Sequence, residues 1–222
     1  SPPQLRHRLL KIAPLALQFA DLFAKLGFLR VGAKVNRPHQ LSFAAQPLVF
    51  LVPNTAVVGP DDPVVIPAIT REVSYEGELA VVIGRIGKDV PASRAHEVIF
   101  GYTCANDVTA RDFQRGDGQW ARAKGMDTFC PLGPAIATDL DPSDLRLVTR
   151  VDGEVRQDGT TADMIFDIPA LIEHLSAAFT LLPGDVILTG TPAGVGLVDH
   201  GSRVEVEIEG IGILANPFVR RD

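Results

Sequence analysis

The sequence contains only two cysteines, Cys104 and Cys130, in 222 residues. Two cysteines are too few for a disulfide framework, and their spacing does not match a zinc site. Both stand among apolar residues. We therefore expect buried free thiols in a reducing compartment, and we assign the protein to the cytoplasm.

The chain also lacks a basic cluster and a long unbroken hydrophobic run. Its formal net charge is −6, and no group of Lys and Arg alternates with aromatic residues, so we expect no nucleic-acid partner. The apolar segment 9–20 is interrupted by Lys11, Pro14 and Gln18. It therefore predicts neither a membrane-spanning helix nor a secretory signal, and we expect no membrane partner.

Short apolar segments bounded by proline and glycine fill most of the remaining sequence. Residues 47–53 and 64–67 are typical of short strands, and Asp152-Gly153 predicts a tight hairpin. Residues 167–180 have the apolar spacing of a helix. Many strands with few helices predict an α+β, β-rich fold built as a mixed β-sandwich roll. We divide the chain into a helical N-terminal segment or lid, residues 1–46, and a β-rich domain, residues 47–222.

A pair of glutamates precedes a buried apolar strand in the segment 74–84. Side chains two residues apart on a strand point to the same face, so Glu76 and Glu78 project together, with the small Gly77 between them. Two such carboxylates repel each other unless a proton or a cation lies between them. They can hold a hard divalent cation, although an ordinary solvated strand face explains them equally well.

A second polar motif follows the apolar segment 98–104. If a helix begins at Asn106 or Asp107, then Asp107, Arg111 and Gln114 lie on one helical face. The alternative is a helix cap with a surface ion pair, which leaves Gln114 without a role. Three carboxylates beside a guanidinium favour a metal ion that in turn holds an anionic substrate.

Two further residues are candidates for substrate contacts. Lys124 stands among small and apolar residues, where an ordinary surface lysine is the alternative. Thr191 lies in the glycine-rich segment 184–196, which follows a predicted strand and lacks the pattern of a phosphate loop. Its backbone N–H groups and the Thr191 hydroxyl can form a nest for a carboxylate, or a plain turn.

With these motifs in place, the chain from about residue 47 to 220 resembles the fumarylacetoacetate hydrolase family. Four blocks carry the resemblance, in the same order as in the family: residues 75–84, 101–114, 124–129 and 183–192. The resemblance implies a homodimeric β-roll with Mg²⁺ or Mn²⁺ bound by Glu76, Glu78 and Asp107; Ca²⁺ is a possible substitute in crystals. It further implies that Arg111, Gln114, Lys124 and Thr191 hold a small 2-oxo or 2-hydroxydienoic acid.

One part of the sequence departs from the family's hydrolases. Those members carry a motif of the form Asn-Tyr-x-x-His-x-x-Glu, whose His–Glu pair activates a water. Here His39 is one residue too close to Asn36, and no acidic residue follows until Asp61. The pattern resembles more the members that act as 2-hydroxyhepta-2,4-diene-1,7-dioate isomerases and 5-oxopent-3-ene-1,2,5-tricarboxylate decarboxylases.

The resemblance therefore predicts a metal-stabilised enolate formed from a small 2-oxo diacid, followed by decarboxylation or enol–keto isomerisation. Lys124 or His39 would move the proton, and Gln114 would assist. One alternative is an acylpyruvate- or fumarylacetoacetate-type C–C hydrolase that uses His39. Another is a non-catalytic, dimeric binding member of the family.

Overall fold

The computed structural model describes residues 9–10, 28–32 and 45–221. Its described strands form three sheets of eight, five and three strands. The eight-stranded sheet has the order β1-β10-β8-β7-β13-β2-β3, with β4 paired to β10. Its strands are β1 (Leu9–Leu10), β2 (Phe28–Gly32), β3 (Leu48–Val52), β4 (Val57–Val58), β7 (Gly77–Ile83), β8 (Ile99–Asn106), β10 (Cys130–Ala137) and β13 (Val186–Leu188).

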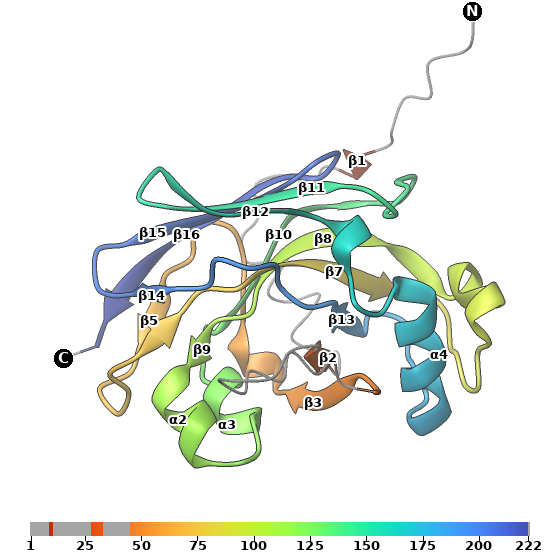
Figure 1. Ribbon diagram of the computed structural model, residues 1–222, viewed down its shortest axis with the longest axis horizontal. Coiled ribbons are helices and arrows are strands. Elements are labelled where there is room, and N and C mark those ends of the chain that lie inside the picture. The colour runs from red at the N-terminus through yellow and green to blue at the C-terminus, as the bar shows by residue number, and fades with distance from the viewer. Residues whose placement is uncertain (1–8, 11–27, 33–44, 222) are drawn as a thin grey trace, which may run out of the picture.

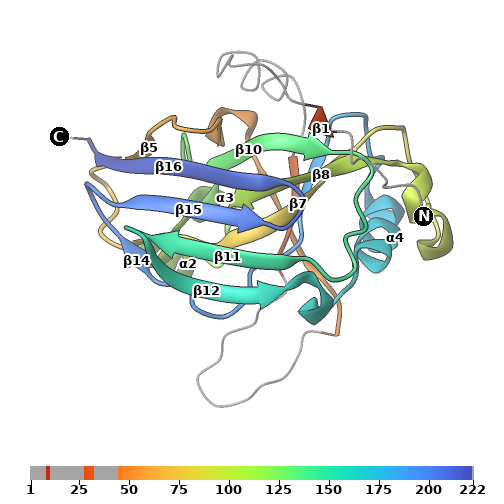
Figure 2. The same cartoon turned by 90° about the horizontal axis from the view of Figure 1, so that it is seen from above.

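The five-stranded sheet, in the order β12-β11-β15-β16-β5, lies over β7 and β8 (Figure 1). Figure 2 looks onto this layer, in which β16, β15, β11 and β12 lie side by side. Its strands are β5 (Val64–Ile66), β11 (Arg146–Val151), β12 (Glu154–Thr160), β15 (Arg203–Ile208) and β16 (Gly212–Arg220). The small sheet joins β14 (Leu197–Val198), β6 (Val73–Ser74) and β9 (Thr109–Ala110). The predicted β-rich α+β roll is confirmed.

The described helices flank the sheets (Figure 1). The helix α4 (Ile168–Ala178) begins at Asp167, whose carboxylate accepts a hydrogen bond from Ala170 N–H at 2.8 Å. Two short helices, α2 (Arg111–Gly116) and α3 (Ala121–Lys124), lie together beside β9 and β3 (Figure 1). The short 3₁₀ helices are η1 (Asn54–Ala56), η2 (Ala92–Glu97) and η3 (Thr161–Asp163). Among the described residues, no helix has the length and apolar character that crossing a bilayer requires.

Strand β7 is buried on both faces and lies at the centre of the core. One face packs with the five-stranded sheet and α4, where Leu79 and Val81 meet Leu175 and Val206 in one cluster. The other face, with Ala80 and Val82, belongs to a second cluster with Phe50 and Trp120. A central strand with no solvent-facing side gives the residues at its end a fixed position.

The N-terminal segment contributes strands to the described sheet. Strand β2 pairs with β13 and β3, and β1 pairs with β10. The other residues before position 45, on which the predicted N-terminal helix falls, lie outside the described residues. The division of the chain at residue 46 stays a prediction.

At Gly77, β7 and the five-stranded sheet approach each other closely. A Cβ at Gly77 would lie 2.1 Å from Thr149 Oγ1 and 3.3 Å from Gln157 Oε1. Between β7 and the facing strands β11 and β12 there is therefore no room for a side chain at this position. This packing requirement explains the glycine between Glu76 and Glu78.

We expect Gly77→Ala to lower the free energy of unfolding by about 1–3 kcal/mol, because overpacking forces the layers apart. Gly116→Ala is the matched control, since a Cβ there meets nothing within 4 Å. It should leave stability unchanged or raise it slightly. Urea unfolding of both variants checks the prediction, and equal stability of the two would contradict it.

Candidate metal and substrate site

The pairing of β7 with β8 brings Glu76, Glu78 and Asp107 together. Gly77 pairs with Asn106 in the antiparallel register of the two strands. Beyond this pair, Asp107 N–H donates to Glu76 O at 2.8 Å, and Glu76 N–H donates to Asn106 Oδ1 at 2.9 Å. The backbone therefore fixes the positions from which the three carboxylates extend.

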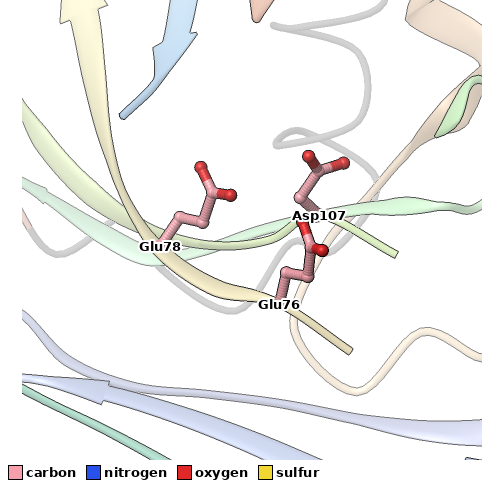
Figure 3. Close-up of side chains that lie close together, drawn as sticks. All are labelled: Glu76, Glu78 and Asp107. Atoms are coloured by element: carbon pink, nitrogen blue, oxygen red, sulfur yellow. The ribbon is translucent and has the colours of Figure 1, made fainter. Parts of the chain in front are cut away.

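The three carboxylates point to the same side of the strands (Figure 3) and are buried, with residue exposures of 8% for Glu76, 2% for Glu78 and 3% for Asp107. One oxygen of each lies within 4.8 Å of the others. Oxygen ligands of a hard divalent cation lie about 2.0–2.6 Å from it, so opposite ligands lie about 4–5 Å apart. The triad therefore fits one divalent metal ion, as the strand spacing predicts for the two glutamates.

Two cationic side chains bind Glu76, one at each oxygen of its carboxylate. Lys124 Nζ donates to Glu76 Oε2 at 2.9 Å, to Asp107 Oδ2 at 2.5 Å and to Thr109 Oγ1 at 2.9 Å. Arg111 Nη2 forms an ion pair with Glu76 Oε1. The Lys124 ammonium also lies 5.4 Å from the centre of the Phe50 ring, which favours its charged form.

Burial and mutual repulsion set the protonation of this cluster. Burial, followed by the charges of Asp107 and Glu76, raises the pKa of Glu78 well above its usual value, against the opposing effects of Lys124 and the Gly190 N–H. Burial alone lowers the pKa of Lys124, but Asp107, Glu76 and Glu78 outweigh it, so the pKa of Lys124 is raised. Lys124 therefore acts as a hydrogen-bond donor here.

The other predicted substrate residues line the same cavity, which has a volume of about 890 Å³. Gln114 Oε1 accepts a hydrogen bond from Arg111 Nη1 at 2.7 Å, so it orients the guanidinium. Thr191 Oγ1 donates to Gly77 O at 2.8 Å and accepts from Gln157 Nε2 at 2.8 Å. In its loop, Gly190 N–H donates to Glu78 Oε2 at 2.7 Å. The glycine-rich loop thus binds a carboxylate of the protein itself.

One interpretation of the sequence is corrected by these positions, and one alternative is excluded. The helix predicted to begin at Asn106 or Asp107 begins at Arg111 instead, because Thr109 and Ala110 pair with β6 as strand β9. Asp107, Arg111 and Gln114 therefore share a cavity without sharing a helical face. The alternative of an ordinary surface lysine at position 124 is excluded, since Lys124 is only 2% exposed.

One predicted residue cannot be placed, and others at the site escaped the sequence patterns. His39 lies outside the described residues. Thr109 accepts a hydrogen bond from Lys124, and Asn106 accepts one from Glu76 N–H. Both have a local signal, because they lie in the polar segment at the end of β8 and just beyond it. Gln157 has none, because it stands in a polar strand 80 residues from Gly77, whose N–H it binds.

Comparison with known protein families matches residues 23–219 to the family described as "Fumarylacetoacetate (FAA) hydrolase C-terminal". The chain belongs to the fumarylacetoacetate hydrolase family. Its relatives with a functional name include enzymes that carry out isomerisation and tautomerisation.

Three relatives illustrate the likeness. The crystal structure of 5-carboxymethyl-2-hydroxymuconate delta-isomerase from Mycobacterium smegmatis has a TM-score of 0.83 and 57% identity, and covers 88% of this chain and 77% of that one. The 2-hydroxyhepta-2,4-diene-1,7-dioate isomerase from Mycobacterium marinum has a TM-score of 0.82, 55% identity and coverages of 88% and 75%. Human mitochondrial oxaloacetate tautomerase FAHD2A is 45% identical over 186 residues, which are 78% of this chain and 59% of that protein.

We expect Glu78→Gln and Asp107→Asn each to weaken Mn²⁺ binding by about tenfold or more, because each removes a charged oxygen ligand. Isothermal titration calorimetry measures the dissociation constants. Glu154→Gln is the control, since the Glu154 side chain is 72% exposed and lies on β12. Equal Mn²⁺ affinity in the site variants and the control would show that the triad does not bind the ion.

We expect Lys124→Met to lower the free energy of unfolding by about 3–5 kcal/mol without added metal, because it leaves buried carboxylates uncompensated. Mn²⁺ should then raise the melting temperature more in Lys124→Met than in the wild type, since the cation replaces the missing charge. Lys88→Met is the control, with a lysine side chain that is 45% exposed. Thermal unfolding with and without Mn²⁺ tests both statements, and an unchanged metal response would contradict the second.

Proposed function

We propose that this protein is a divalent-metal-dependent enzyme that interconverts the enol and keto forms of a small 2-oxo diacid. The observation that carries the proposal is the convergence of Arg111 and Lys124 on Glu76, beside Asp107 and Glu78, on the wall of one cavity. Likeness to isomerases and to an oxaloacetate tautomerase supports the same reaction class.

The charges of the cluster favour an anionic substrate once a cation is bound. Three carboxylates with Arg111 and Lys124 sum to a formal −1 when all are ionised. A divalent cation brings this sum to +1, so an anion entering the cavity is attracted. A ligand set made only of oxygens suits Mg²⁺ or Mn²⁺, and Ca²⁺ as a substitute.

The side chains have separate roles in the proposed reaction. Glu76, Glu78 and Asp107 would hold the divalent cation, which would supply an electrophile for the carbonyl oxygen of the substrate. Arg111, oriented by Gln114, binds the adjacent carboxylate of the substrate. Lys124 gives a proton to the carbon and recovers one from the enol hydroxyl, so the isomerisation leaves its protonation unchanged.

A second carboxylate of the substrate has a partner in Arg115. This residue lines the same cavity one helical turn beyond Arg111. Its present partner is Glu72, at 2.9 Å, in an ion pair whose side chains are 62% and 41% exposed. Such an exposed pair contributes little stability, so Arg115 can exchange Glu72 for a substrate carboxylate at low cost. This arrangement favours a diacid over a monoacid.

Decarboxylation and hydrolysis require different catalytic groups at the same site. Loss of CO₂ from a 2-oxo diacid such as oxaloacetate needs only the electrophile, so it is the second candidate reaction. Hydrolysis also needs a general base within about 2.6–3.2 Å of a water. No histidine lines the cavity among residues 45–221. The described part of the site therefore supports isomerisation better than hydrolysis.

We expect the protein to accelerate the conversion of enol to keto oxaloacetate with Mg²⁺ or Mn²⁺, and to lose this activity with a chelator. Lys124→Met and Arg111→Met should lower kcat/KM by about 10²-fold or more, because each removes charge stabilisation or proton transfer. Lys88→Met should retain the wild-type rate. The loss of enol absorbance measures the reaction, with metal but no protein as the blank.

The same samples separate the alternatives. Pyruvate formation from oxaloacetate above the blank would favour a decarboxylase, and acetylpyruvate cleavage would favour a hydrolase. Activity that a chelator leaves unchanged would overturn the metal dependence. Mn²⁺ binding without turnover of either compound would favour a non-catalytic binding member.

A further inference from the structure

Gln157 is a buried polar side chain on a strand that otherwise faces solvent. It is 1% exposed, whereas its neighbours in β12, Arg156 and Asp158, are exposed. A buried carboxamide requires partners for its donor and acceptor atoms, and here it has three. Gly77 N–H donates to Gln157 Oε1 at 3.0 Å. Gln157 Nε2 donates to Thr191 Oγ1 at 2.8 Å and to Pro192 O at 2.9 Å.

These hydrogen bonds lie where β7 loses its neighbouring strand. Strand β13 ends at Leu188, opposite Ala80. Beyond this point, Thr189 N–H and Oγ1 donate to Leu79 O at 3.1 and 2.9 Å, and Thr191 Oγ1 donates to Gly77 O at 2.8 Å. Thr189 and Thr191 therefore continue the hydrogen bonding of β7, mainly through their side chains, after the neighbouring strand has ended.

The carboxamide of Gln157 has the same donor and acceptor groups as a peptide unit. Together with Thr191 it closes a ring of hydrogen bonds around Gly77, the residue between the two glutamates. The same loop supplies Gly190 N–H to Glu78 Oε2 at 2.7 Å. A change in the position of the loop would therefore change the position of Glu78.

The loop also rests directly on β12 around Gln157. A Cβ at Gly194 would lie 2.0 Å from Arg156 O, and one at Gly159 would lie 2.9 Å from Pro192 Cβ. Tyr75 Oη donates to Gly194 O at 2.7 Å. Residues 190–194 are thus held between β12 and the start of β7, with the Gln157 side chain at the centre.

We infer that Gln157 is a positioning residue for the metal ligands: its carboxamide holds the Glu76-Gly77-Glu78 segment against the Gly190–Pro192 loop in the geometry that binds the cation. The inference rests on the proposed function only in that Glu76 and Glu78 bind a divalent cation. Gln157 itself is not among the residues that line the cavity; it acts through Gly77 and Thr191.

Asn216 provides a matched control for a buried carboxamide. It is 2% exposed, and its Nδ2 donates to Gly59 O at 2.7 Å and to Asp62 O at 2.9 Å. It lies on β16 and does not line the cavity. Gln157→Met and Asn216→Leu each replace a buried carboxamide by an apolar side chain of nearly the same shape. Both should lower the melting temperature.

We expect only Gln157→Met to weaken Mn²⁺ binding, on the order of tenfold, as for other residues that orient metal ligands. Calorimetry on the full chain, well below the melting temperature, measures the dissociation constants. Thr191→Val removes the hydroxyl that closes the same ring and should weaken binding similarly, whereas Thr191→Ser should retain it. The effects of Gln157→Met and Thr191→Val should not add in the double variant, because both open one ring.

Hydrogen–deuterium exchange gives a readout that does not depend on metal. Gln157→Met should increase exchange in residues 189–196, whereas Asn216→Leu should increase it near residues 59–62. Wild-type Mn²⁺ affinity in Gln157→Met, or an equal loss in Asn216→Leu, would overturn the inference. So would unchanged exchange in residues 189–196.

If the wild type itself binds no Mn²⁺, the metal-dependent function fails, and the exchange experiment alone decides whether Gln157 holds the loop. If Gln157→Met does not fold, Thr191→Val gives the same test.

Discussion

Burying three carboxylates within 4.8 Å of one another is costly, and the rest of the site compensates for that cost. Lys124 and Arg111 supply two positive charges at Glu76, and Gly190 supplies an N–H to Glu78. One negative charge remains uncompensated. Burial, together with the charges of Asp107 and Glu76, raises the pKa of Glu78. A proton cancels the uncompensated charge, and a divalent cation reverses its sign. A site that stores this repulsion in a rigid frame is suited to bind a cation and, through it, an anion.

The rigidity of this frame comes from the position of β7 between two packed layers. Glu76 directly precedes β7 and Glu78 is its second residue. Between them, Gly77 lets the five-stranded sheet approach, and Gln157 and Thr191 replace the missing neighbour strand. Asp107 is fixed by the register of β7 with β8. The positions of the three carboxylates therefore depend on pairings between segments far apart in sequence, and not on any one local element.

Features set by local chemistry were predicted correctly from the sequence. Asp152 and Gly153 adopt the positive φ angles, 54° and 84°, that a tight hairpin requires, and β11 pairs with β12 across them. Asp167 caps α4, as a helix over 167–180 predicts. The period of two along a strand placed Glu76 and Glu78 on one face. Asp107 and Gln114 were added to the site from a helical spacing that the structure does not contain, since α2 begins only at Arg111. The role of Lys124 came from the family resemblance, because no spacing rule links positions 76 and 124.

The features that were missed depend on contacts across the sheets. The helix expected at Asp107 begins later, because Thr109 and Ala110 form a strand that pairs with Ser74 and Val73. The helical pattern over 106–114 contains no information on this pairing. The sequence around Gln157 reads as a solvent-facing hairpin strand, and its other residues do face solvent or lie half-buried. Strand β13 ends at Leu188, so the polar backbone groups of β7 beyond that point need other partners. The burial of Gln157 follows from this need, because its carboxamide binds Gly77 N–H. A residue recruited to replace a missing strand is recognisable only once the sheet is known.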